Sequence, residues 1–489
     1  MLRALRLSVA LAWLALGEVA AQGIPKQEAK LTPVGGPVGA FGTTVGVSGD
    51  TAVVGSYLGP VPLVFVRDGT SWTEQASLNS AEPVTLGYGV SVAISGDTAV
   101  VSDPGLGLSG VNWTGPGAVF VFVRQGTSWT KQAKIAEPDF ASWSAFGTSI
   151  ALSGDTLVVG AGAFPSDAAY VFVRNGAVWS QQAKLQGGVF LGQAVSISGD
   201  TILAGGPSDG VHVFVRNGTS WTAQTTLTTV PSVPNFGQAV AVSGNTAIIG
   251  SDHKAFVFFR SGAAWNEQAE LDEPVPNQGF GRSVAVSDVD DAAVVGTPAA
   301  TVGGHSSAGT AYVYLRSGSG WEQQGALEAS DASDSGKLGF AVALSGDTAV
   351  AGTDNAGAAY VFHPIQPFNK LGGGLPGVSG VPLLNGTGTL DAGSAGSLTL
   401  ANAAPFTLTM LFVSLTDTPT PFKGGTLSTV PIAFQLPVGT FFTGSWTLPW
   451  SAWPSGVPSG TLLYFQVGVS DAGAVKGVAI SNLLKATQP

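Results

Sequence analysis

Residues 146–161 read FGTSIALSGDTLVVGA, and closely similar segments occur six more times along the chain. Each contains an alternating run such as SIALS, a short link such as Gly-Asp, and a β-branched run such as TLVVG. These runs predict two strands, and glycine at the first position of a two-residue link is typical of a type II′ hairpin turn. The other six copies begin at residues 41, 88, 191, 236, 280 and 338. The chain is therefore predicted to form the same hairpin seven times.

A second signature follows each hairpin. In the copy above it is AAYVFVRN (168–175), a short glycine turn, and VWSQQAKL (178–185). These runs predict a third and a fourth strand joined by another tight turn. Seven such four-stranded units, beginning 44 to 58 residues apart, predict an all-β fold. Because radially stacked sheets bury each other's faces, the expected architecture is a seven-bladed β-propeller.

The chain begins this region with the end of a repeat. The segment IPKQEAKL (24–31) matches the tail of the fourth strand, whereas the seventh third strand, YVFH (360–363), is followed by no such tail. We therefore expect Gln27 to Leu31 to pair with Tyr360 to His363 and to close the propeller. Closing the ring in this way would leave no sheet edge exposed.

The repeated residues resemble a known family. FG followed by SVAxSGDTAVVG and GxAYVFVR is similar to the FG-GAP repeat of the integrin α-chain headpiece and of many exported bacterial proteins, over about residues 24–363. The resemblance implies a propeller and a role in binding or adhesion. Integrin-type repeats often carry an Asp-rich calcium loop, but here six of the seven loops are shortened to SGDT or SGNT. Calcium needs six or more oxygen ligands, so a solvated turn is favoured even at the remaining acidic segment, SDVDD (287–291), and no metal or cofactor is predicted.

Other segments define the ends of the chain. Residues 1–21 have Arg3 and Arg6, an apolar run and small residues at Val19 and Ala21, which is typical of a signal peptide. The propeller is expected at 22–363 and a Pro- and Gly-rich linker at 364–371. About seven short strand-like runs in residues 372–489 predict a smaller β-sandwich. The mature protein, which has no cysteine, is expected to be secreted or on the cell surface.

Charge and motifs limit the possible functions. The net charge of −11, without a basic stripe, argues against nucleic acid as a partner. No stretch after the signal peptide is long enough for a membrane helix, and a monomer is expected. The four histidines are scattered, and neither a G-x-S-x-G elbow nor a P-loop occurs. We therefore predict a non-catalytic protein; the alternative is an extracellular polysaccharide hydrolase or lyase that uses carboxylates from distant loops.

The longer loops all lie at the end of the propeller opposite the tight turns, and they are the predicted binding face. Trp113 and Trp143 lie in such loops outside the repeated tryptophan positions, and they could stack on a sugar or anchor a peptide. The alternative is that they cover the central channel or pack on a neighbouring loop. Asp103 and Asp139 complete the predicted ligand-binding set, and the expected partner is an extracellular protein or glycan. These two belong to an acidic rim that favours a cationic partner or serves only solubility: Asp103, Glu137, Asp139, Asp167, Asp209, Asp252, Asp272, Glu273, Asp331 and Asp354.

Six arginines end the third strands, on the tight-turn side. Because they recur at one position of the repeat, we expect a structural role, in which each pairs with the acidic residue of an SGDT turn on the same or an adjacent sheet. They are Arg67, Arg124, Arg174, Arg216, Arg260 and Arg316.

Overall fold

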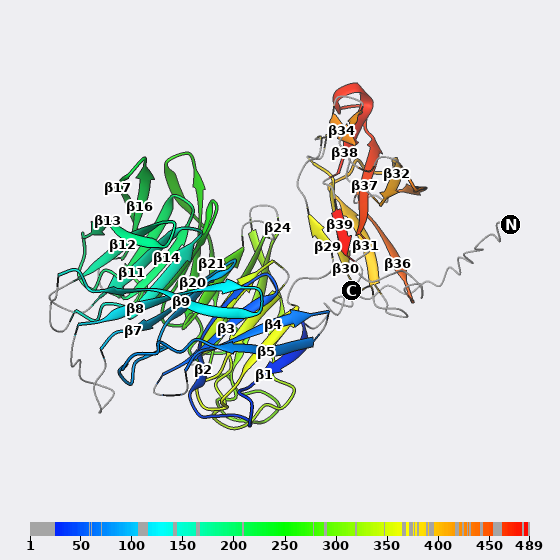
Figure 1. Ribbon diagram of the computed structural model, residues 1–489. Helices are drawn as coiled ribbons and strands as arrows, with labels where there is room; N and C mark the ends of the chain where they lie inside the picture. Colours follow the sequence, from blue (N-terminus) through cyan, green and yellow to red (C-terminus); the bar gives the residue numbers. More distant parts are fainter. Residues whose placement is uncertain are drawn as a thin grey trace.

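The computed structural model is an all-β structure (Figure 1). The predicted signal peptide lies outside the residues that it describes. It describes residues 25–487 except 58, 60, 70, 106–115, 140–143, 163–166, 208–209, 277, 288–290, 318–319, 347, 364–367, 371–374, 376, 379–380, 388–389, 391–395, 416–419, 423–424, 428, 430–431, 441–443, 453–461 and 482–483.

Seven four-stranded antiparallel sheets account for the described part of residues 25–363. In six of them the strands follow one another in chain order, and we number these sheets 1 to 6. Sheets 1 to 3 are β2 (Phe41–Ser48), β3 (Thr51–Ser56), β4 (Leu63–Asp68) and β5 (Ser71–Ser77); β6 (Val92–Ser95), β7 (Thr98–Asp103), β8 (Ala118–Gln125) and β9 (Ser128–Ala136); and β10 (Ser149–Ser153), β11 (Thr156–Ala161), β12 (Ala168–Asn175) and β13 (Val178–Leu185). Sheets 4 to 6 are β14 (Ala194–Ser198), β15 (Thr201–Gly206), β16 (Gly210–Asn217) and β17 (Ser220–Leu227); β18 (Ala239–Ser243), β19 (Thr246–Gly250), β20 (Lys254–Ser261) and β21 (Ala264–Asp272); and β22 (Val284–Ser287), β23 (Ala292–Thr297), β24 (Thr310–Ser317) and β25 (Gly320–Leu327). Sheet 7 has the order β26 (Ala341–Ser345), β27 (Thr348–Gly352), β28 (Ala359–His363) and β1 (Lys26–Leu31).

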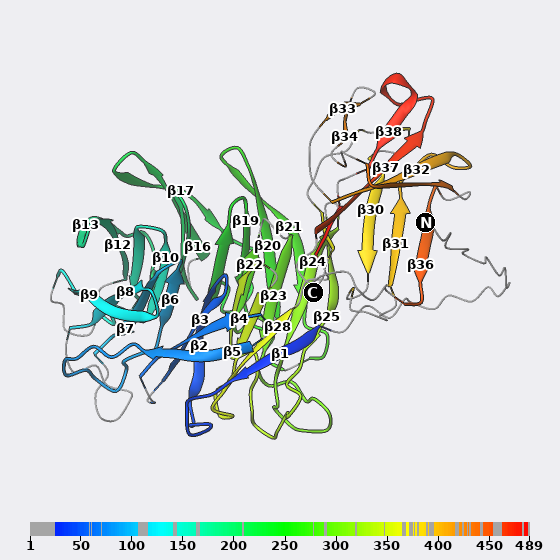
Figure 2. The same ribbon diagram turned by 45° about the vertical axis from the view of Figure 1, so that its right-hand side comes forward.

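Contacts between neighbouring sheets close them into a ring, and Figures 1 and 2 show the sheets from two directions. The first strand of each sheet contacts the first strand of the next, and β2 contacts both β6 and β26. The hydrophobic core lies between neighbouring sheets, so the second strands are buried along their whole length, as in TLVVGA of β11. An alternating apolar and polar pattern would not suit a strand covered on both faces, which is why these runs are almost continuously apolar.

The FG pair positions the entry to each sheet. Phe146 is fully buried between sheets 2 and 3 and packs edge-on against Tyr170 and Phe172, with ring centroids 5.4 and 6.2 Å away. The following glycine allows a close backbone approach with positive φ. At Gly192, for example, φ is +97°, and a Cβ would lie 2.3 Å from the carbonyl oxygen of Ala168. A residue with a Cβ atom is therefore excluded at this position, which requires glycine.

A bulge in the fourth strand connects each of sheets 1 to 5 to the sheet that follows it. In sheet 3 the bulge lies at Gln182, which the pairing of Val171 with Ala183 and of Phe172 with Gln181 leaves out. The side-chain oxygen of this glutamine accepts a hydrogen bond of 2.7 Å from the Trp221 indole of sheet 4. A bulge re-aims a side chain that a regular strand would direct elsewhere. The same arrangement joins Trp129 to Gln75, Trp179 to Gln132, Trp265 to Gln224 and Trp321 to Gln268.

The repeated arginines also connect neighbouring sheets, and the predicted pairing with the turn residues is confirmed. Arg174 Nε donates to Asp155 in its own sheet at 2.6 Å, its Nη1 donates to Thr98 of sheet 2 at 2.9 Å, and its guanidinium lies 5.4 Å from the ring centre of Trp179. The equivalent turn partners are Asp50 for Arg67, Asp97 for Arg124, Asp200 for Arg216, Asn245 for Arg260 and Asp291 for Arg316.

The two ends of the ring region meet in sheet 7. Strand β1 pairs antiparallel with β28, from Lys26 opposite His363 to Leu31 opposite Ala359, so the expected pairing is confirmed. Its bulge lies at Glu28, the position that glutamine occupies in the other sheets. Figure 2 shows β1 beside β28, at the junction with sheet 1.

Residues after 367 form separate sheets with one shared core (Figure 1). The larger sheet contains β29 (Phe368–Lys370), β39 (Leu484–Thr487), β37 (Leu462–Ser470), β32 (Leu408–Ser414), β35 (Phe434–Gly439) and β38 (Val478–Ile480), and a 3-10 turn, η1 (Val475–Gly477), precedes β38. A second sheet contains β30 (Leu383–Thr387), β31 (Gly396–Ala401) and β36 (Trp446–Trp450), and β33 (Thr420–Phe422) pairs with β34 (Gly425–Leu427).

One boundary differs from the expected one. Residues 368–370 lie within the predicted linker, but they pair with β39 and belong to the larger C-terminal sheet. The short run Phe-Asn-Lys has neither glycine nor proline, so nothing in it opposes strand formation, although its Pro- and Gly-rich flanks favoured a linker. Within the described part of the chain, no helix is both long and apolar enough to cross a membrane.

Candidate binding site at the long-loop end of the ring

A hollow of about 480 Å³ opens at the end of the ring where the first strands begin. This is also where the second strands end, so the longer connections lie on the same side, which we call the long-loop end. The segments just before the first strands of sheets 3 to 6 and just after the second strands of sheets 3 and 4 line the hollow, and most of the lining residues are polar: Ala145, Thr148, Gly162, Gln193, Pro207, Asn235, Gln238 and Arg282.

Four of these residues occupy one position of the repeat. Thr148, Gln193, Gln238 and Arg282 each follow the glycine of the FG or LG pair. That glycine is held close to the backbone of the neighbouring sheet, so the next residue stands at the mouth of the ring. In sheets 1, 2 and 7 the same position holds Thr43, Val90 and Phe340. The repeat therefore keeps the glycine and varies the side chain that lines the opening.

Arg282 differs from the other cations of the ring. It is exposed, its guanidinium lies 4.8 Å above the ring centre of Phe340, and it has no carboxylate partner among the described residues. The described lysine side chains of the ring, in contrast, are in ion pairs: Lys30 with Asp331, Lys131 and Lys134 with Glu82, Lys184 with Asp139, Lys254 with Glu270 and Asp272, and Lys337 with Asp354.

The other polar groups of the hollow are only partly satisfied. The Thr148 hydroxyl is buried and has no hydrogen-bond partner among the described residues. Gln238 donates a long hydrogen bond of 3.5 Å to the carbonyl oxygen of Gly281, and Asn235 donates to Asp252 at 2.9 Å. Amide groups provide both donors and acceptors, so the hollow offers a cation and several neutral hydrogen-bonding groups to a ligand.

The predicted aromatic residues Trp113 and Trp143 both lie outside the described residues. Asp103 is buried and accepts hydrogen bonds from the backbone and the hydroxyl of Thr85, which fixes the loop before sheet 2. Neither Asp103 nor Asp139 lines the hollow.

Asp139 fastens one sheet to the next. Its carboxylate pairs with Lys184 and accepts a hydrogen bond of 2.7 Å from the Tyr170 hydroxyl, both in sheet 3. Hydrogen bonds from Lys184 and Tyr170 hold the pKa of Asp139 below its ordinary value. Asp331 is engaged in the same way by Lys30 and Tyr360 of sheet 7. These carboxylates are ionised and internally paired at neutral pH.

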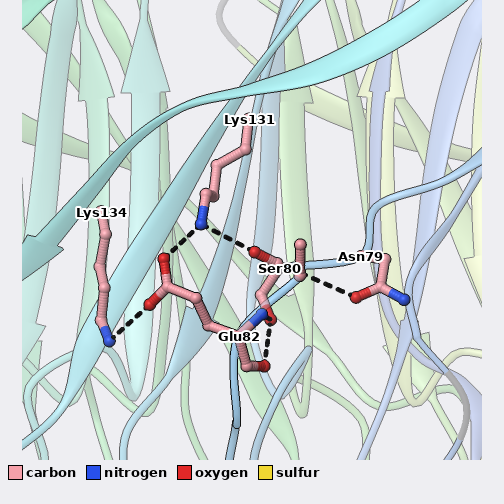
Figure 3. Close-up of polar contacts among 6 residues, drawn as sticks. Asn79, Ser80, Glu82, Lys131 and Lys134 are labelled. Carbon is pink, nitrogen blue, oxygen red and sulfur yellow. Dashed lines mark hydrogen bonds and ion pairs between the residues drawn. The ribbon is translucent and has the colours of Figure 1, made fainter.

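A third fastener uses Glu82, shown in Figure 3. The Glu82 carboxylate contacts both Lys131 and Lys134 of sheet 2, and Lys131 also donates to the carbonyl oxygen of Ser80 at 2.8 Å. Hydrogen bonds from the two lysines lower the pKa of Glu82. Glu82, which is not part of the acidic rim, therefore ties a connecting loop to the sheet that follows it, as Asp139 and Asp331 of the rim do.

The described residues contain no group of three histidine, aspartate or glutamate side chains that could hold a metal ion. Of the acidic segment considered for calcium, residues 288–290 lie outside the described part, and Asp291 lies 3.3 Å from Arg316. The described lining of the hollow has no carboxylate or histidine. The polar groups of this described lining are a guanidinium, three amides and a hydroxyl.

Comparison with known proteins addresses the repeat. A family model described as "FG-GAP repeat" matches residues 129–172 and 321–362. The chain contains FG-GAP repeats. Each matched segment runs from the fourth strand of one sheet to the third strand of the next, so an FG-GAP repeat here spans the junction of two sheets.

Other comparisons add little to the FG-GAP assignment. None of the curated proteins compared with the chain matches it. One similar solved structure is described as "Crystal Structure of Mitotic Checkpoint Complex"; it is 16% identical, covers 74% of this chain and 99% of its own, and has a TM-score of 0.49.

The polar lining of the hollow was not predicted. The residues expected to bind a ligand were two tryptophans outside the repeated tryptophan positions and two aspartates of the acidic rim, whereas Gln193, Gln238 and Arg282 follow the glycine of the FG or LG pair. A signal was present, because Arg282 is the one arginine after residue 24 that does not end a third strand.

Proposed function

We propose that this protein is an exported, non-catalytic binding protein of the adhesion type. In this proposal residues 1–21 direct export, the ring is a seven-bladed β-propeller closed by its N-terminal strand, and the residues after the linker form a β-sandwich. The long-loop end recognises an extracellular protein or glycan, with Trp113 and Trp143 as candidate anchors.

The difference between the two ends of the ring carries the proposal. At the tight-turn end the repeated arginines pair with turn residues and threonines, so their hydrogen-bonding capacity serves the fold. At the long-loop end the hollow contains an exposed guanidinium without a described carboxylate partner. Binding groups on rigid β scaffolds are usually carried at such loop-bearing ends.

The test is to probe the mature protein, residues 22–489, against an array of glycans and peptides. We expect saturable binding with the ligand recovered intact, and weaker binding by the Trp113→Ala and Trp143→Ala variants. Val178→Ser is a matched control, because Val178 is exposed on a tight turn at the opposite end and should not affect binding.

Two outcomes would contradict the proposal. Release of a shortened glycan would favour the polysaccharide hydrolase or lyase instead. Equal loss of binding in the Val178→Ser variant would place the binding surface away from the long-loop end. If both tryptophan variants bind the ligand as tightly as the unsubstituted protein does, the aromatic anchors are wrong but the binding function stands.

A further inference from the structure

We propose that the hollow lined by Arg282, Gln193 and Gln238 binds a single acidic sugar unit, a uronate, through its carboxylate and hydroxyl groups. This inference rests on the proposed binding function and names its ligand class. It does not involve the tryptophan anchors.

The charge of Arg282 is the first argument. Each of the other arginines described in the ring is held by a turn residue, and the described lysine side chains are in ion pairs, so Arg282 is the cation left to meet an anion from outside. A guanidinium presents paired N–H groups that match a carboxylate. Stacking on Phe340 restricts the plane of the guanidinium while leaving its N–H groups at the edge.

The neutral groups of the hollow are the second argument. Gln193, Gln238 and Asn235 can donate to and accept from hydroxyl groups, and the buried Thr148 hydroxyl lacks a described partner. The volume of the hollow, about 480 Å³, falls within the range of about 300–1,000 Å³ that is common for small-ligand sites. The described lining offers only Ala145, Pro207 and Gly162 as apolar surface, which suits a hydroxyl-rich ligand better than an apolar peptide side chain.

The surrounding charge restricts the ligand to one acidic unit. The chain has a net charge of −11, and Asn235 of the lining donates a hydrogen bond to the carboxylate of Asp252. A densely charged polymer would be repelled by this field. An isolated carboxylate at Arg282 meets the guanidinium while the rest of the sugar remains neutral.

The shape of the hollow depends on a glycine. A Cβ on Gly162 would lie 2.3 Å from the backbone nitrogen of Gln193. The Gly162→Ala substitution must therefore displace Gln193, one of the amide groups of the proposed site, without changing any charge. It provides a second variant that tests the site independently of Arg282.

The experiment is calorimetric titration of the mature protein with oligosaccharides that end in a uronate, each compared with its carboxyl-reduced counterpart. We expect the reduced forms to bind at least about tenfold more weakly, since a charge-assisted hydrogen bond is worth that much or more. Arg282→Gln should remove this preference, and added salt should weaken binding of the uronate form alone. Because Arg282 is exposed, the melting temperature of Arg282→Gln should match that of the wild type.

The outcomes separate this inference from the proposed function. Equal binding of the acid and reduced forms, or an unchanged preference in Arg282→Gln, would overturn the inference and leave a binding protein. Binding confined to peptides or neutral glycans would also overturn the inference and leave a binding protein. Failure to bind any array member would overturn both. Should Arg282→Gln unfold, a Gly162→Ala variant with unaltered uronate affinity would still contradict the site.

Discussion

Sheet 7 and sheet 3 have the same arrangement of four strands and the same bulge, but the outer strand of sheet 3 follows its third strand along the chain, whereas that of sheet 7 comes from the other end of the ring region. In sheet 3 the bulge holds Gln182, which accepts a neutral hydrogen bond from Trp221. In sheet 7 it holds Glu28, which accepts from Trp72 at 3.0 Å and lies 3.1 Å from His363 Nε2 and 3.7 Å from Arg67. A charged network therefore replaces the amide in the ring sheet whose outer strand is not joined to its third strand by a turn.

Residues near Glu28 also differ from their counterparts in the other sheets. Pro25 stands where the other outer strands have tryptophan. In sheet 6, Gly325 leaves room for it, since a Cβ there would come 2.7 Å from Pro25 Cδ. Burial by itself raises the pKa of Glu28, but hydrogen bonds from His363 and Trp72 and the charge of Arg67 outweigh it, so the pKa is lowered. The closing strand is thus held by ionic contacts where other strands are held by chain connectivity.

Removing residues 22–31 should have the largest effect, because it takes the outer strand from sheet 7 together with the buried core residue Leu31, and it uncovers the core residues that Leu31 packs against. Four or more strand hydrogen bonds at about 1 kcal/mol each and about 2 kcal/mol for Leu31 predict a loss above about 5 kcal/mol. Denaturant unfolding of the mature and truncated proteins would measure it. Adding a peptide of sequence IPKQEAKL should restore part of the loss, while a peptide with the same residues in scrambled order should not. An unchanged midpoint after truncation would contradict ring closure by β1.

The ring closure was predictable from sequence because QEAKL (27–31) matches QQAKL (181–185) at four of five positions, with Glu28 in place of Gln182. The arginine pairs were predictable because repetition identifies them. The bulge was not, since the strand residues read alike whether or not one of them is left unpaired. Arg282 was missed for a related reason: which side chains from different repeats share one hollow depends on the geometry of the ring, and no repeat contains that information alone.

Glu28→Ala and Gln182→Ala compare the two bulges directly. Loss of Glu28 leaves Trp72 and His363 without their acceptor in a nearly buried position, so we expect about 2–3 kcal/mol of destabilisation. Loss of Gln182 removes one neutral hydrogen bond and should cost about 1 kcal/mol. Chemical denaturation of both variants measures the difference. Equal losses would show that the charged network adds nothing beyond the amide.

Glu28→Gln restores the residue found in the other sheets and should cost about 1 kcal/mol near neutral pH, because a charge-assisted contact becomes a neutral one. The folded-state pKa of Glu28 is lowered, so its contribution is present above the pKa of the unfolded chain and is lost as pH falls through the folded-state value. The difference in unfolding free energy between wild type and variant should shrink between about pH 5 and pH 3. A gap that stays constant over this range would mean that Glu28 is not the titrating group.

The smallest effect is expected where the sheets are regular. Asp97 pairs with Arg124 but is largely exposed, so a double-mutant cycle of Asp97→Ala and Arg124→Ala should give a coupling of only about 0.5 kcal/mol, falling with added salt. The matched cycle uses Arg260 and Asn245, where the acceptor is neutral, and its coupling should change less with salt. If both cycles respond equally to salt, or neither shows coupling, the turn contact would not stabilise the sheet electrostatically. The arginine would then act through Trp129 and Thr51, the two groups that it contacts besides the turn.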